Sequence, residues 1–311
     1  MTQMHTLSVV IPTYNRGGIL LDPINLLLNQ DHLADEILVI DQTSYQKNDA
    51  VVAALTALVN KNKIIWIRLD APSIPIAMNK GLQAAKSSYV LFIDDDVEFK
   101  SDFIHQHRKA INSEKASAYI GQILQPDEAV TIRDDDYYSK FQLVCDLSFP
   151  FSSNKPAEIY NCMAGNLVVD RQAAIQCGGF DQQFSGAAYR FETEFCRRMI
   201  AYTNKPFHFN PQASLNHLKI ATGGTRAVVN SFLTSMSPVH SQGDYYFAMR
   251  CGKKKYEIMS YVLRRFFGCL KKRFYLHKPW WIPIRLVGEI RGLYKACVMF
   301  KQGPRLINEV E

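Results

Sequence analysis

The sequence lacks paired cysteines, a membrane-length apolar run and a signal-peptide pattern. Its 7 cysteines are an odd number and no two form a CxxC pair, which argues against a disulfide framework or a structural zinc site and indicates reduced thiols. No run of about 18 uncharged apolar residues occurs, and the N-terminal sequence MTQMHTLSVVIPTYNR has no signal-peptide pattern. We therefore expect a cytoplasmic protein that is neither secreted nor membrane-spanning.

Length and composition indicate a large core. The chain has 311 residues, of which 47% are hydrophobic, enough for one large α/β domain or for two lobes with an appendage. The net charge of +7 is unevenly distributed, because residues 250–311 contain 15 Lys and Arg against 4 Asp and Glu. The basic character therefore belongs to the C-terminal region.

Short apolar runs alternate with helical patterns in the first 97 residues. Strands are predicted at 7–11, 36–40, 64–69 and 89–93, and helices at 18–30, 49–59 and 76–85. This alternation is typical of βαβ units with a mainly parallel sheet, in which ligands bind at the carboxyl ends of the strands. Polar residues follow three of the predicted strands: Thr13, Tyr14, Asn15 and Arg16; Asp41 and Gln42; and Asp94, Asp95 and Asp96.

The acidic triplet Asp94-Asp95-Asp96 directly follows the apolar run YVLFI. Three carboxylates in one tight loop repel one another, and a divalent cation would offset that repulsion. Carboxylate oxygens suit Mg²⁺ or Mn²⁺, and such ions usually keep substrate phosphates in their coordination shell. The alternative is a solvated loop or a helix N-cap, since aspartates favour both positions.

Taken together, an ordered set of motifs resembles glycosyltransferase family 2. The set contains VVIPTYNR, a strand ending at Asp41, a helix with Asn79 and Gly81, and YVLFIDDD, and it continues through GN, GGFD, FETE and ASLNHLKIATGGTR to Arg226. The resemblance implies the GT-A fold, an α/β, Rossmann-like and mainly parallel sheet, here with a C-terminal helical extension. Residues 1–97 would be the nucleotide-binding half, 98–226 the acceptor-binding and catalytic half, and 227–311 a basic aromatic helical region.

The resemblance also implies a donor site with a Mn²⁺ or Mg²⁺ ion. The metal ligands would be Asp94, Asp96 and His217. Met78 stands where many members have an arginine, so Lys80 is expected to take over phosphate or ribose contacts. The nucleotide-binding residues implied in this way are Pro12, Tyr14, Arg16, Asp41, Asn79, Lys80, Asp94 and Asp95.

Inverting sugar transfer requires a general base for the acceptor hydroxyl. Glu192 matches the position of the base in the family, but Phe191 replaces the acidic residue that often precedes it, so Glu194 is a second candidate. The alternative for both is a carboxylate that favours a helix start. Asn166 matches a segment that lines the acceptor pocket, or else satisfies loop backbone, and Arg226 would close a loop on the diphosphate.

The C-terminal region interleaves basic and aromatic residues, as in LRRFFGCLKKRFYLHKPWW. This pattern is typical of a helix at an anionic membrane surface, here the inner face of the cell membrane. The alternative is a helical cap over the catalytic domain, and a nucleic-acid patch is disfavoured because the first half already provides a phosphate site.

The predicted function is transfer from a nucleotide sugar to a glycan or lipid-linked acceptor in bacterial cell-surface polysaccharide synthesis. A UDP-sugar is the favoured donor, with a dTDP- or GDP-sugar as alternatives. Two other functions stay open: a catalytically silent GT-A partner subunit, and a sugar-phosphate nucleotidyltransferase. The second is disfavoured because Gly17-Gly18 has no following lysine and is a poor match to a glycine-rich phosphate loop.

Overall fold

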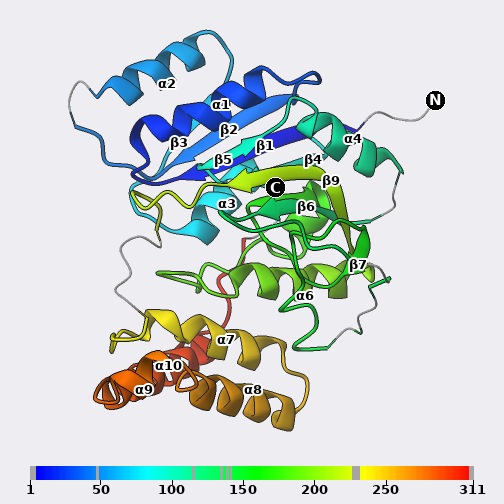
Figure 1. Ribbon diagram of the computed structural model, residues 1–311. Coiled ribbons are helices and arrows are strands. Elements are labelled where there is room, and N and C mark those ends of the chain that lie inside the picture. The colour runs from blue at the N-terminus through cyan, green and yellow to red at the C-terminus, as the bar shows by residue number, and fades with distance from the viewer. Residues whose placement is uncertain are drawn as a thin grey trace.

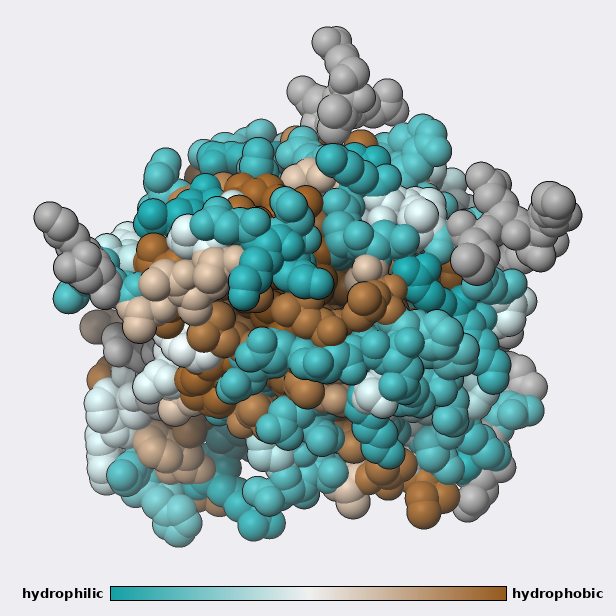
Figure 2. Space-filling view, turned by 90° about the horizontal axis from the view of Figure 1, so that it is seen from above, coloured by the Kyte–Doolittle hydropathy of each residue, from teal (hydrophilic) through white to brown (hydrophobic). Residues whose placement is uncertain are grey.

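The computed structural model describes residues 5–46, 49–113, 116–133, 136–137, 140, 142–225 and 232–307. Figure 1 shows an α/β domain and, below it, a region made of helices. Seen from above in Figure 2, the α/β domain is largely hydrophilic, and hydrophobic side chains gather in a band across the middle of this face.

The N-terminal part of the sheet is parallel, with the strand order β3-β2-β1-β4. The register pairs Thr13 with Asp41, so the carboxyl ends of β1 and β2 are level. The seven elements predicted over residues 7–93 are confirmed: β1 (Leu7–Thr13), α1 (Leu21–Leu28) after the 3₁₀ turn η1 (Gly17–Leu20), β2 (Glu36–Asp41), α2 (Ala50–Asn60), β3 (Ile65–Arg68), α3 (Ile74–Ala84) and β4 (Tyr89–Ile93).

Past residue 97 the same sheet continues with mostly antiparallel pairs. It runs from β4 through β8, β6 and β9 to β5, and β7 pairs with β9. Within this part, β6 and β9 are parallel, and the other pairs are antiparallel. The elements are β5 (Val97–Phe99), α4 (Phe103–Ser113), β6 (Ala118–Leu124), β7 (Ala157–Ile159), β8 (Asn166–Asp170), α5 (Arg171–Gln176), α6 (Phe191–Thr203) and β9 (Phe207–His217).

Helices cover both faces of the sheet, because alternate strand residues point to opposite sides. Val9 belongs to a core cluster with residues of α1, α2 and α4, whereas its neighbour Val10 belongs to a cluster with residues of α3, α5 and α6. A Cβ atom on Gly81 would lie 2.3 Å from Cγ1 of Val10. Glycine at this position therefore lets α3 pack closely on β1.

The predicted helical extension is confirmed and caps the α/β domain. It comprises η2 (Pro238–His240), α7 (Gln242–Cys251), α8 (Lys255–Gly268), α9 (Phe274–His277) and α10 (Trp281–Gln302). Helix α7 packs against α6 and α10. Arg285 and Glu289 of α10 form a fully buried ion pair. None of the helices in the described ranges is long and apolar enough to cross a bilayer.

After α10 the chain returns to the α/β domain. The amide of Arg305 donates to the Asp181 carboxylate at 2.9 Å, and the amide of Ile307 donates to the carbonyl of Gly178 at 3.0 Å. The side chain of Ile307 joins the core cluster on the α3, α5 and α6 side of the sheet. The helical extension is thus attached to the α/β domain through its last described residues as well.

Candidate active site

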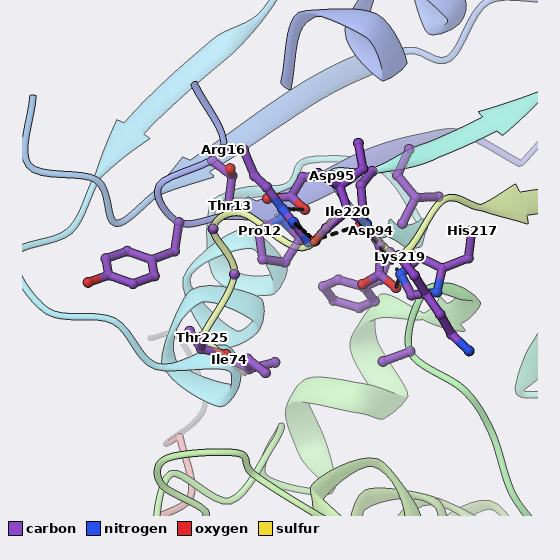
Figure 3. Close-up of a pocket in the computed structure, with 18 of the residues that line it drawn as sticks. Pro12, Thr13, Arg16, Ile74, Asp94, Asp95, His217, Lys219, Ile220 and Thr225 are labelled. Carbon is purple, nitrogen blue, oxygen red and sulfur yellow. Dashed lines mark hydrogen bonds and ion pairs between the residues drawn. The ribbon is translucent and has the colours of Figure 1, made fainter. Parts of the chain in front are cut away.

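A cavity of about 490 Å³ opens at the carboxyl edge of β1 and β4, between these strands, the start of α6 and the chain after β9. The polar side chains at the ends of the first and fourth strands meet there, as the parallel-sheet prediction requires. Figure 3 shows Asp94 of the acidic loop beside His217 and Lys219 in this cavity. Its polar lining residues include Thr13, Tyr14, Arg16, Gln42, Asp94, Asp95, Asp96, Gln125, Glu192, His217 and Lys219.

The three aspartates of the triplet have different surroundings. The side chain of Asp94 is 51% exposed, whereas Asp95 and Asp96 are buried. Burial raises the pKa of Asp95 to about 6, although Arg16, 2.8 Å from its Oδ1, opposes the shift. Burial would also raise the pKa of Asp96, but contact with His217 and the charge of Arg16 outweigh it, so this pKa is lowered.

His217 connects the end of β9 to the triplet. Its Nδ1 lies 3.1 Å from Oε1 of Gln125, and its Nε2 lies 3.2 Å from Oδ1 of Asp96 and 3.8 Å from Oδ2 of Asp94. A hydrogen on Nδ1 donated to Gln125 would orient the ring with Nε2 towards the two carboxylates. Contact with Asp96, opposed by burial, raises the pKa of His217.

The predicted metal ligands fit a divalent cation in their chemistry. Oδ1 of Asp96 is buried and lacks a well-directed hydrogen bond from any described residue, and it faces Nε2 of His217. Two carboxylates with an imidazole suit Mn²⁺ or Mg²⁺. Within the described ranges, however, no three such side chains are gathered closely enough to form a complete metal site. Asp94, Asp96 and His217 would therefore supply only part of a coordination shell, with phosphate and water oxygens completing it.

Arg16 links the triplet to the loop that follows β9. Its guanidinium pairs with Asp95 and with Oδ2 of Asp96 at 3.0 Å, and it donates to the carbonyls of Ile220 and Thr222 at 2.8 and 2.6 Å. These protein groups engage Nε and both Nη nitrogens, so Arg16 holds the loop against the acidic residues. Arg16 also lines the cavity, and its role in nucleotide binding stays a prediction.

Asp41 does not line the cavity, contrary to the sequence prediction. It is fully buried, and its Oδ2 accepts hydrogen bonds from the Tyr45 hydroxyl at 2.8 Å and from Nε1 of Trp66 at 2.9 Å. The neighbouring Gln42 lines the cavity in its place. The carboxylate of Asp41 thus organises the end of β2 and has little acceptor capacity left for a ribose or a base.

Three further predicted site residues lie away from the cavity. Asn79 is buried, and its amide bonds both the main-chain nitrogen and the carbonyl of Phe180. Lys80 is exposed on α3 and does not contribute to the lining. Asn166 is fully buried, where it bonds His107 and the main chains of β6 and β9. The two asparagines therefore join segments of the core, as the structural alternative for Asn166 predicted.

The two candidate bases are clearly distinguished. Glu192, half-buried in the first turn of α6, lines the cavity. Glu194 is buried and makes a two-point ion pair with Arg198, with both N–O distances at 2.7 Å. Glu194 lines neither this cavity nor the one on the other side of Glu192, and its carboxylate is engaged by Arg198, so Glu192 is the better-placed candidate base. Arg226 lies outside the described residues.

The sequence analysis missed two polar residues of the cavity. Gln125 directly follows β6 and Lys219 follows β9, and both line the cavity. Because β6 and β9 are parallel, their carboxyl ends meet at one edge, and the strand-end rule that found the acidic triplet applies to them. The sequence does not predict strands at β6 and β9, so it gives no indication that Gln125 and Lys219 follow strand ends.

Solved structures define the class of the fold. TarS residues 1–349 of S. aureus, in complex with UDP-GlcNAc, match with a TM-score of 0.61 at 15% identity, over 96% of this chain and 92% of that one. The mannosyltransferase PcManGT of Pyrobaculum calidifontis, in complex with GDP-Man and Mn²⁺, matches with a TM-score of 0.55 at 13% identity, over 97% and 80%. The predicted GT-A fold of glycosyltransferases is thus confirmed.

The sequence then gives the family. Residues 8–177, more than half of the chain, match the model of glycosyl transferase family 2, and the chain belongs to this family. The GalNAc(5)-diNAcBac-PP-undecaprenol beta-1,3-glucosyltransferase of Campylobacter jejuni is 34% identical over 98 residues, which are 32% of each chain. The alignments cover less than half the length of the curated relatives that the chain matches.

Proposed function

We propose that the chain is an inverting, metal-dependent glycosyltransferase that acts on a nucleotide-sugar donor. The observation that carries this proposal is the single cavity lined by Asp94, Asp96, His217 and Glu192. Residues for a metal and a candidate base are the two components that such a transfer needs. Residues 1–97 would supply most of the donor side and residues 98–226 the base.

The nucleotide sugar would lie along the β1 edge, with its diphosphate at the acidic triplet. Pro12, Thr13, Tyr14 and Gln42 line this part of the cavity. A bound Mn²⁺ or Mg²⁺ ion would stabilise the negative charge of the departing nucleoside diphosphate. We favour a UDP-sugar because TarS was solved with UDP-GlcNAc, whereas PcManGT, solved with GDP-Man and Mn²⁺, keeps a GDP-sugar as an alternative.

Glu192 would act as the general base. As the acceptor oxygen attacks the anomeric carbon from the face opposite the diphosphate, the hydroxyl proton passes to the Glu192 carboxylate. The new carbon–oxygen bond forms while the bond to the diphosphate oxygen breaks, so the configuration inverts. The helix dipole favours an ionised carboxylate at this position in the first turn of α6, and an ionised carboxylate can accept that proton.

Donor turnover tests this proposal. Purified protein is incubated with UDP-, dTDP- and GDP-sugars with and without Mn²⁺, and the free nucleotide is measured. Metal-dependent release of the nucleoside diphosphate supports the proposal. Absence of both turnover and nucleotide binding favours a silent GT-A partner subunit, and formation of a nucleotide sugar from sugar 1-phosphate and a nucleoside triphosphate favours a nucleotidyltransferase.

We also propose a role in bacterial cell-surface polysaccharide synthesis at the inner face of the cell membrane. The name of the Campylobacter jejuni relative includes an undecaprenol-linked acceptor, which supports a lipid-linked or glycan acceptor here. Tyr256, Met259 and Phe267 of α8 and Trp280 are more than half exposed, beside the basic residues of the same region. Salt-sensitive sedimentation with anionic vesicles, but not with zwitterionic ones, is the expected result.

A further inference from the structure

A second cavity, of about 630 Å³, lies between the start of α6, the segment before β8 and the helical extension. Met163 and Glu192 line both this cavity and the first one. The two cavities therefore meet at the candidate base.

Because the second cavity reaches Glu192, it is a candidate site for the acceptor. A general base must be within hydrogen-bond reach of the hydroxyl that it deprotonates. If the donor fills the first cavity, the acceptor has to reach Glu192 from another side. The second cavity leads to Glu192, and its size is in the range of small-molecule sites.

The charges of the second cavity are only partly balanced. Asp244 pairs with Arg190 at 3.0 Å and with Arg265 at 3.1 Å, and Arg265 also lies 3.2 Å from Glu289. These ion pairs engage the half-buried Arg190 and Arg265 and hold the extension against the start of α6. Asp244 and Glu289 supply two negative charges to this cluster, whereas Arg190, Arg265 and Arg285 supply three positive ones, so the cluster keeps a net positive charge.

Arg264 and Lys272 differ from these half-buried arginines. Both are exposed, both line the cavity, and neither pairs with a carboxylate among the residues that the structure describes. Two uncompensated cations at one cavity favour an anion, and guanidinium and ammonium groups bind phosphate and carboxylate oxygens. The aromatic residues Phe151 and Tyr189 line the same space and provide apolar surface against which a sugar ring can pack.

We propose that the second cavity binds the acceptor and that Arg264 and Lys272 bind an anionic group of it. This inference rests on the proposed function of the first cavity. The anionic group is a phosphate, as in a sugar linked through a diphosphate, or a sugar carboxylate, as in a uronic acid. The residues of α8 and the following turn are then determinants of acceptor specificity, while the chemistry stays at Glu192.

The test compares acceptors that differ only in charge. Each sugar of a small panel is offered as a neutral alkyl glycoside, as the corresponding uronic acid glycoside and as a short-chain alkyl diphosphate ester. The wild-type protein is expected to prefer at least one anionic form over the neutral one by tenfold or more in kcat/KM. Arg264→Gln combined with Lys272→Gln should reduce this preference at least tenfold.

A matched variant controls for the loss of charge. Lys271→Gln with Arg273→Gln removes the same number of charges from exposed neighbouring positions that do not line the cavity. It should keep the preference within twofold. Preference for the diphosphate ester identifies a phosphate ligand, and preference for the uronic acid identifies a carboxylate. Equal use of charged and neutral acceptors, or equal effects of the two double variants, overturns the proposal.

A different result would refute the proposed glycosyltransferase function itself. In that case neither donor turnover nor Mn²⁺-dependent UDP binding would be observed with any acceptor. In that case, calorimetric titration with the three acceptor forms still tests the second cavity. Stronger binding of an anionic form, weakened at least tenfold by the Arg264 and Lys272 substitutions, supports it, and equal binding of all forms overturns it.

Discussion

Replacing Asp96 by Asn removes one charge from the acidic triplet while keeping its shape. Asp96 is 1% exposed, and its Oδ2 accepts a hydrogen bond from the Ile220 amide at 2.9 Å and pairs with Arg16 at 3.0 Å. Hydrogen bonds to charged groups contribute about 1.5–3 kcal/mol each. Asn retains one acceptor oxygen, and repulsion from Asp95 is relieved, so the free energy of unfolding should fall by only about 1–2 kcal/mol.

The effect of Asp96→Asn on turnover should be much larger than its effect on folding. Loss of a metal-binding carboxylate that stabilises the leaving group should lower kcat/KM at least ~100-fold, or about 2.7 kcal/mol. Donor hydrolysis with Mn²⁺ measures this loss, and the rise in melting temperature on adding UDP and Mn²⁺ should shrink in parallel. Asp95→Asn is the matched control and should stay within about tenfold of wild type. Near-normal turnover of Asp96→Asn, or an equal loss in both variants, would refute the role of Asp96.

Glu192→Gln should lower transfer to acceptor by ~100-fold or more while UDP binding is retained; calorimetry and product assays measure both, and normal transfer would exclude Glu192 as the base. Gly165→Ala should lower Mn²⁺-dependent turnover, because its Cβ would lie 2.3 Å from Oδ2 of Asp94, whereas Gly18→Ala, with nothing within 4 Å, should not. Burial lowers the pKa of His107 from 6.5 to about 4, although a hydrogen bond opposes the shift. The unfolded chain therefore binds the proton first, and His107 should account for a loss of about 2 kcal/mol in unfolding free energy between pH 7.5 and 5. Urea unfolding should show a correspondingly smaller loss in His107→Asn, and an unchanged pH dependence would contradict this.

The first half of the fold could be predicted because its signals are local. Each strand from β1 to β4 is a short apolar run, and parallel pairing brings the carboxyl ends of β1 and β2 to the same edge, where the structure pairs Thr13 with Asp41. The triplet after β4 then lies at the edge where ligands bind. The second half pairs strands that are distant in sequence, such as β6 with β9, and no local pattern reports such pairing.

The predicted site residues that lie away from the cavity have a common physical explanation. Asp41 is sequestered by Trp66, 25 positions further along the chain, and Asn79 bonds Phe180, 101 positions away. Asp41 and Asn79 can both form polar contacts with a ligand, but the packed structure shows that Trp66 and Phe180 already make those contacts. Glu194 is the exception, because its partner Arg198 is one helical turn away and an i,i+4 pair is visible in the sequence.

The chain is bonded to the α/β domain on both sides of the helical extension. Before it, the Gly224 amide bonds the Tyr14 carbonyl beside the acidic triplet, and after it, Arg305 and Ile307 bond Asp181 and Gly178. A chimaera that exchanges only residues 232–302 between relatives has to preserve two junctions at once. Exchange of the extension between relatives is thus constrained, because a new extension must fit between the loop after β9 and the core contacts of Arg305 and Ile307.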